Sequence, residues 1–304
     1  MTTATQHPSG AAPYGGRQDE PTQILYGTPS GHPAPQPQHR RSASTILAAL
    51  PLLAAAVVGL LGTIGLAYYT ANGQAYDENA LATLSAAGTA ANSVLTGQLE
   101  QVSLALAIAT LVVLMIVGFA RGRVRVGFGA AVLVAGANVT TQAIKHLVAR
   151  PDLGYGATES LPSGHTTLVF SLALAAVLVA PRRLRWLVAM GAAAVGGLTG
   201  IATVIAGWHR PSDAVAALLV TAAWGALVSA VITGRPRDGV RGFSGAFPAV
   251  FGAGLAAVGL IIYGFGWAPG DDDTRIIPFT VITVLAVAGL LTGAYSRLVA
   301  RTSN

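Results

Sequence analysis

The sequence predicts an all-α, polytopic membrane protein, a helical bundle of eight spans, and two observations carry this prediction. Of the 304 residues, 53% are hydrophobic and 10% are charged. The apolar residues fall in runs of about twenty, the length at which a helix crosses a bilayer. The runs lie near Ile46–Tyr69, Val102–Ala120, Val126–Lys145, Gly164–Ala180, Leu187–Ala206, Ala214–Ile232, Phe247–Trp267 and Ile276–Leu298.

The basic residues predict how these spans are oriented. Fourteen of the 18 basic residues lie in the N-terminal tail, in the loops after alternate spans or near the C-terminus. By the positive-inside rule these regions are cytoplasmic, both termini included. The other four basic residues share the opposite face with nine of the twelve acidic residues. The charges thus indicate a multi-pass protein of the cell membrane and no nucleic-acid partner.

The chain divides into three parts. Residues 1–43 hold seven of the sixteen prolines and no apolar periodicity, which predicts a disordered cytoplasmic tail. Residues 44–233 contain six spans and all the motifs below, and residues 234–304 add two further spans. The first apolar run is too long and too far from Met1 for a cleaved signal. Without cysteine, the chain has no disulfide and no thiolate metal site.

A first group of polar residues closes the third span. Lys145 is the only lysine in the chain, and Asn138 and Gln142 precede it at spacings that place all three on one helical face. The lysine alone is equally compatible with an interfacial anchor whose side chain snorkels. Arg150 follows closely, with a planar donor fork suited to phosphate oxygens. The pair favours an anion site.

A second motif, Pro162-Ser163-Gly164-His165, stands where a loop becomes the fourth span. Backbone N–H groups and the positive end of the helix dipole converge there, which favours an anion. The same four letters occur at 29–32 without a helix or partner residues, so the position of the second copy carries the argument.

A third motif opens the sixth span, where His209 and Asp213 are four residues apart and Pro211 suits a first helical turn. One interpretation is that Asp213 and Ser212 cap the helix while His209 sits at the interface. The other is that the carboxylate orients the imidazole. His165 brings a second histidine to the same face, and two histidines with cations provide a nucleophile and a proton donor.

The three motifs resemble those of the type 2 phosphatidic acid phosphatase (PAP2) family. The family pattern is Lys-x6-Arg-Pro, then Pro-Ser-Gly-His, then Ser-Arg-x5-His-x3-Asp, on a six-helix bundle with its site at the outer face. The order and placement agree here over about residues 46–232. In two places the chain departs from the pattern. Only four residues separate Lys145 from Arg150, so Asp152 holds the position of the family arginine, and Ala202-Thr203 replaces Ser-Arg, which leaves Arg210 as the nearest substitute cation.

The resemblance implies a metal-independent phosphatase without a cofactor, with its site on the extracytoplasmic side. His209 would be the nucleophile that forms a phosphohistidine, Asp213 would orient it, and His165 would protonate the leaving oxygen. The phosphoryl group would bind the residues Lys145, Arg150, Ser163, Gly164 and Arg210. The implied substrate is a lipid phosphate or an isoprenoid diphosphate, such as an undecaprenyl or decaprenyl carrier. The sequence sets no oligomeric state.

The departures keep two other functions open: a non-catalytic lipid-phosphate binder or transporter on the same bundle, and a lipid phosphotransferase. Three further segments carry weaker expectations. Residues 71–101 lie on the outer surface near the site or form a plain connector. The carboxylates of Asp271–Asp273 are solvated or attract a divalent ion. Gly196, Gly197 and Gly200 form a face of small residues for close helix packing.

Overall fold

A computed structural model of the chain describes residues 39–88, 97, 104–158, 160–232 and 275–302. Within these residues the protein contains eight α-helices and no strand. The helices are α1 (His39–Tyr69), α2 (Ala71–Ala87), α4 (Leu104–Ala120), α5 (Val124–Leu147), α6 (Gly164–Val179), α7 (Arg185–Ile205), α8 (Pro211–Ile232) and α10 (Ile276–Thr302).

Seven of the eight expected spans appear as helices, and the eighth, Phe247–Trp267, lies outside the described residues. Five of the helices, α1, α5, α7, α8 and α10, are long and apolar enough to cross a membrane. The apolar helices α4 and α6 are shorter, at 17 and 16 residues. These findings confirm an all-α, polytopic membrane protein. The three-part division of the chain stays a prediction.

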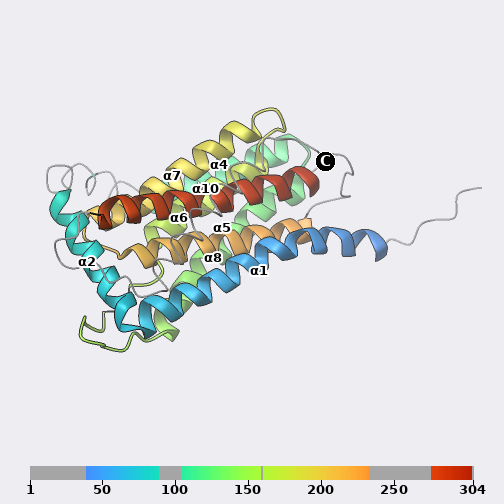
Figure 1. Cartoon of the computed structure of the whole chain (residues 1–304). Coiled ribbons are helices and arrows are strands. Elements are labelled where there is room, and N and C mark those ends of the chain that lie inside the picture. Colours follow the sequence, from blue (N-terminus) through green and yellow to red (C-terminus); the bar gives the residue numbers. More distant parts are fainter. Residues whose placement is uncertain (1–38, 89–96, 98–103, 159, 233–274, 303–304) are drawn as a thin grey trace, which may run out of the picture. The chain divides into compact units, whose positions relative to one another are not determined.

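Helix α8 lies at the centre of the bundle, in contact with α1, α5, α6, α7 and α10 (Figure 1). Because other helices surround α8, 15 of its 22 residues are buried. Helix α4 packs on α5 and α6, and α10 packs on α7 and α8. Helix α2 crosses one end of the bundle directly after α1 (Figure 1).

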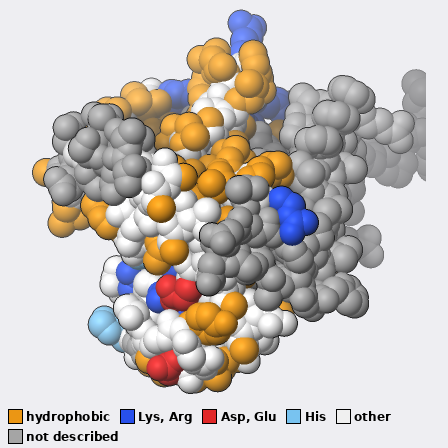
Figure 2. Space-filling model, turned by 60° about the vertical axis from the view of Figure 1, so that its left-hand side comes forward, with side chains coloured by type: hydrophobic (Ala, Val, Ile, Leu, Met, Phe, Trp, Pro, Cys, Tyr) orange, Lys and Arg blue, Asp and Glu red, His pale blue; other side chains and the backbone are white. Residues whose placement is uncertain are grey.

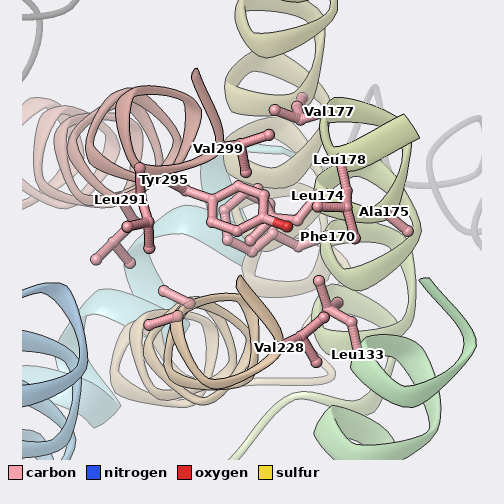
Figure 3. Close-up of a cluster of buried hydrophobic side chains, with 14 of the residues drawn as sticks. Leu133, Phe170, Leu174, Ala175, Val177, Leu178, Val228, Leu291, Tyr295 and Val299 are labelled. Carbon is pink, nitrogen blue, oxygen red and sulfur yellow. The ribbon is translucent and has the colours of Figure 1, made fainter. Parts of the chain in front are cut away.

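The hydrophobic core joins α10 to the helices of the motifs. Figure 3 shows the Tyr295 ring of α10 among side chains of α6 and α8, including Phe170, Leu174 and Val228. Tyr295, Phe170 and Leu174 are fully buried. Between membrane helices such side chains contribute through close van der Waals packing, because lipid tails are as apolar as they are. The last span therefore belongs to the same core as α6 and α8.

The two ends of the bundle differ in chemistry. At one end, Nη1 of Arg121 donates to the carbonyl of Val179 at 2.7 Å, and a guanidinium nitrogen of Arg185 donates to Ala180 at 3.2 Å. Arg185 also interacts electrostatically with Arg123 and Arg182. The end of α5, the starts of α6 and α8, and helix α2 all lie at the other end. The basic loops and the three motifs thus lie at opposite ends.

Close packing of α7 uses the expected face of small residues. A side chain on Gly196 would run into the Phe170 ring of α6, and one on Gly197 would lie 2.8 Å from a methyl group of Leu285 in α10. On the same helix, Gly191 has no atom within 4 Å of the position a side chain would take. The expected small-residue packing is confirmed for this helix.

We predict that Gly196→Ala lowers the free energy of unfolding by about 1–3 kcal/mol, because the added methyl group overpacks a buried site. The matched control, Gly191→Ala, should raise it by about 0.5–1 kcal/mol, since alanine costs less backbone entropy than glycine in a helix. Thermal unfolding of both variants in detergent measures the two effects. Equal stabilities for the two variants would contradict this packing.

Candidate active site

The three motifs come together at the end of the bundle that carries α2. The N–H of Ser163, before α6, donates to the carbonyl of Asp213 in α8 at 2.9 Å, so the two helix starts are joined directly. Lys145 at the end of α5 interacts electrostatically with Asp213. Figure 2, which faces this end, shows acidic and basic side chains next to one another and a histidine at the edge.

The loop between α7 and α8 presents His209. Gly207 has a φ of 75°, in the left-handed region that favours glycine, and this conformation ends α7. The N–H of Trp208 then donates to Thr203 O at 3.0 Å and that of Gly207 to Val204 O at 2.9 Å, the bonding of a Schellman motif. This fixed turn places the His209 side chain beside the first turn of α8.

Asp213 contacts both His209 and the start of α8. Its Oδ2 lies 3.3 Å from Nδ1 of His209 and accepts the backbone N–H of Arg210 at 2.9 Å. The second bond is the return half of a capping box. The geometry is therefore compatible with both interpretations of this carboxylate, as a helix cap and as the group that orients His209. Pro211 is the first residue of α8, as its fixed φ predicts.

His165 lies near His209, in the first turn of α6. Its ring is 5.3 Å from the Trp208 ring, centroid to centroid, and it interacts electrostatically with His209 and Lys145. The half-buried imidazole is thus held by a neighbouring aromatic ring while remaining accessible. The structure brings both predicted histidines into one site.

The start of α6 is built to leave N–H groups free. The hydroxyl of fully buried Ser163 accepts the N–H of Thr166 at 3.3 Å, so this serine caps the helix. In the described chain, the N–H groups of Gly164 and His165 have no protein acceptor. A side chain on Gly164 would meet open space, so the backbone is approachable there. The capping role accounts for Ser163, and its direct contact with phosphate stays a prediction.

Arg150 is a buried cation with unused donors. It is 3% exposed, and its guanidinium lies 5.6 Å from the centroid of the Tyr68 ring in α1. Its Nη2 donates to Glu78 at 3.3 Å, while Nε and Nη1 have no partner in the described structure. Buried donors without partners are costly, and a bound anion would satisfy them.

Two other predicted residues have different surroundings from those expected. Arg210 is 6% exposed, and its guanidinium donates to Glu78 at 2.6 Å, to Ser160 Oγ at 2.8 Å and to Thr158 O at 3.2 Å. Gln142, expected to share a polar face with Lys145, is exposed. Thr141 is the buried polar residue at that level, with its Oγ1 2.9 Å from Oγ1 of Thr167.

Helix α2 supplies three site residues that the sequence did not single out: Gln74, Asp77 and Glu78. Their spacing of three and four places them on one face. The Gln74 amide donates to Tyr68 O at 2.8 Å and to Pro151 O at 2.7 Å. Asp77 accepts from the N–H of Ser212 at 3.2 Å and from its hydroxyl, so it caps α8 from another helix. The segment is therefore more than a connector.

The buried Asp77 makes stability depend on pH. Burial raises the pKa of its carboxyl to about 7 from 3.8, and the charge of Asp213 adds to the rise. Between about pH 4 and about pH 7 the folded protein therefore holds this proton more tightly than the unfolded chain, so stability falls as pH rises, and the loss is complete above that range.

We predict that Asp77→Asn removes this slope, which for one proton is at most about 1.4 kcal/mol per pH unit. The free energies of unfolding of wild type and variant, measured in detergent at several pH values across the window, should converge at acid pH and diverge toward neutral pH. Parallel curves would contradict the raised pKa of Asp77.

The arrangement describes a helical membrane protein in which two histidines, one of them beside a buried carboxylate, lie near a lysine at the starts of two helices. Residues 103–237, which include α4 to α8, match the family model of the PAP2 superfamily. The superfamily supports a phosphatase-type function. The chain matches no curated protein and no solved structure.

Proposed function

We propose that the protein is a metal-independent membrane phosphatase that hydrolyses a lipid phosphate or isoprenoid diphosphate through a phosphohistidine at His209. One observation carries the proposal. Nδ1 of His209 faces the Asp213 carboxylate, so Nε2 is the nitrogen left to attack phosphorus. The geometry is that of an imidazole held in one tautomer by a carboxylate, as in a Ser-His-Asp triad.

In the first step the Nε2 lone pair forms an N–P bond in line with the scissile P–O bond, which breaks. Asp213 holds the proton on Nδ1 and stabilises the positive ring. His165 gives its proton to the departing lipid oxygen. Lys145, the free donors of Arg150 and the N–H of Gly164 stabilise the charge on the three phosphoryl oxygens.

In the second step water attacks the phosphohistidine, the N–P bond breaks, and inorganic phosphate leaves. His165, now neutral, accepts the proton of the attacking water, which returns both histidines to their first state. Every proton in the two steps is carried by residues of the site. Within the described residues, no three carboxylate or imidazole groups gather as a metal site requires.

Two features support a lipid substrate at the extracytoplasmic face. A pocket of about 70 Å³ lies between α1, α2, α8 and α10, beside the start of α8, and its lining is largely apolar (Leu66, Ala67, Val215, Phe279 and Val284 among others). The basic loops lie at the far end of the bundle, which the positive-inside rule assigns to the cytoplasm. The motif end would then face outward.

A non-catalytic lipid-phosphate binder is the second candidate, and the surroundings of Arg210 favour it. The guanidinium of this arginine already donates hydrogen bonds within the protein, to Glu78, Ser160 and Thr158. With the family arginine of the third motif also absent, fewer cations are available for the transition state. A binder would retain the lipid phosphate without releasing phosphate.

We predict that the purified protein in detergent micelles releases inorganic phosphate from lipid phosphates or isoprenyl diphosphates with EDTA present. Vanadate should inhibit the reaction, because it mimics five-coordinate phosphorus. Binding without release, weakened by Lys145→Ala, would replace the phosphatase with the binder. Loss of donor phosphate only when a lipid or glycan acceptor is added would indicate a phosphotransferase.

A further inference from the structure

Glu78 of α2 places a carboxylate between the two arginines of the site. Its Oε1 accepts from Arg150 Nη2 at 3.3 Å and from Arg210 Nε at 2.6 Å. The same oxygen thus joins the arginine after α5 to the arginine before α8. The Glu78 side chain is 26% exposed, whereas those of the two arginines are 0% and 8% exposed. An anion of the protein therefore lies at the accessible edge of a buried cation pair.

This arrangement limits how many phosphoryl oxygens the site can bind. The Arg210 guanidinium donates to Glu78, to Ser160 Oγ and to Thr158 O, all within the protein. Arg150 keeps two free donors, Nε and Nη1. Together with Lys145 and the first N–H groups of α6, these donors match the oxygens of one phosphoryl group. Among the described residues, no comparable set of donors remains for a second group.

We propose that Glu78 is a specificity-determining residue that makes the site favour a lipid monophosphate over the diphosphate of the same lipid. The inference rests on the proposed phosphatase function. The carboxylate holds the place that the second phosphate of a diphosphate would take between the two arginines. A diphosphate would also bring its additional negative charge close to Glu78, an unfavourable contact that a monophosphate avoids.

The test compares farnesyl phosphate with farnesyl diphosphate, two substrates with the same tail, in mixed micelles. Initial rates of phosphate release give kcat/KM for each, and their ratio is the readout. Wild type should favour the monophosphate. Glu78→Gln, which removes the charge at nearly constant size, should shift the ratio about tenfold toward the diphosphate, mainly by lowering KM for that substrate.

Three variants separate specificity from a purely structural role. Glu78→Asp keeps the charge and should leave the ratio near the wild-type value even if kcat falls. Asp152→Asn removes one charge from an exposed side chain that binds the N–H groups of Gly154 and Gly156, and it should not change the ratio. Because Glu78→Gln leaves two buried arginines without their carboxylate, the double variant Glu78→Gln/Arg210→Gln restores the charge balance and should return the ratio to that of wild type.

The outcomes are distinct. An unchanged ratio in Glu78→Gln, or equal shifts in Glu78→Gln and Glu78→Asp, would overturn the role of Glu78 while leaving the phosphatase intact. A wild type that prefers the diphosphate would overturn it as well. A wild type that binds both lipids but releases phosphate from neither would instead overturn the proposed function.

Discussion

Replacing His209 with glutamine should lower the rate of phosphate release by at least about 10⁴-fold. A loss of this size is expected when the nucleophile is removed from a set of catalytic residues that act together. Glutamine retains much of the volume and polarity of histidine but has no nitrogen that can carry the phosphoryl group. Because Lys145, Arg150 and the start of α6 are unchanged, binding of the lipid phosphate should persist. Initial rates and a separate binding titration measure the two quantities.

The matched control for this variant is His146→Gln. His146 is an exposed histidine in the last turn of α5, directly after Lys145, and no step of the mechanism uses it. Its replacement should leave turnover unchanged. Comparable turnover in wild type and His209→Gln would contradict the phosphohistidine at this position, and an acid-labile phosphoprotein trapped in wild type but not in the variant would support it.

The spans were predictable because they depend on local properties of the chain. An apolar run of sufficient length must satisfy its backbone within a helix, whatever its neighbours are. The sequence also placed the start of α6 at Gly164. The apolar residues predict a sixth span that begins at Ala214, three residues after the observed start of α8 at Pro211. Termini defined by apolar residues alone omit the polar first turn.

Helix α2 was not predictable in the same way. Its Ala-rich sequence has no apolar run of the length that a span requires, and the sequence predicts that its polar residues are exposed. Gln74 and Asp77 are nevertheless fully buried, because the loop that follows α5 and the first turn of α8 supply hydrogen-bond partners for them. The signal available in the sequence was the spacing of Gln74, Asp77 and Glu78, three polar residues on one helical face.

The surroundings of the arginines show a second limit. From the motifs, Arg150 and Arg210 could be placed near one another and near an anion. Glu78 precedes Arg210 by 132 residues, and only the folded chain brings the carboxylate between them. The motifs alone therefore predict phosphate as the partner of Arg210, whereas in the folded chain Glu78 accepts a hydrogen bond from it. Long-range ion pairs of this kind leave no local pattern.

The second large effect is expected for Asp213→Asn, which should lower turnover by about 10³–10⁴-fold without preventing folding. Oδ2 of Asp213 accepts from the backbone N–H of Arg210 and faces Nδ1 of His209. Because this one oxygen makes both contacts, an asparagine oxygen in its place keeps the bond from Arg210, and the helix cap survives. The side chain then carries no negative charge, so it holds the proton on Nδ1 less firmly and no longer stabilises the positive ring of the phosphohistidine. The comparable substitution in a Ser-His-Asp triad lowers kcat about 10⁴-fold.

Two comparisons make this result specific. Asp152→Asn, an equal change at an exposed carboxylate, should retain wild-type turnover. The double variant His209→Gln/Asp213→Asn should be no slower than His209→Gln alone, because residues that act as one unit give non-additive losses. If Asp213→Asn instead lost stability and kept its turnover per folded molecule within tenfold of wild type, Asp213 would only cap α8. Loss of turnover with unchanged stability would make Asp213 the residue that sets the His209 tautomer.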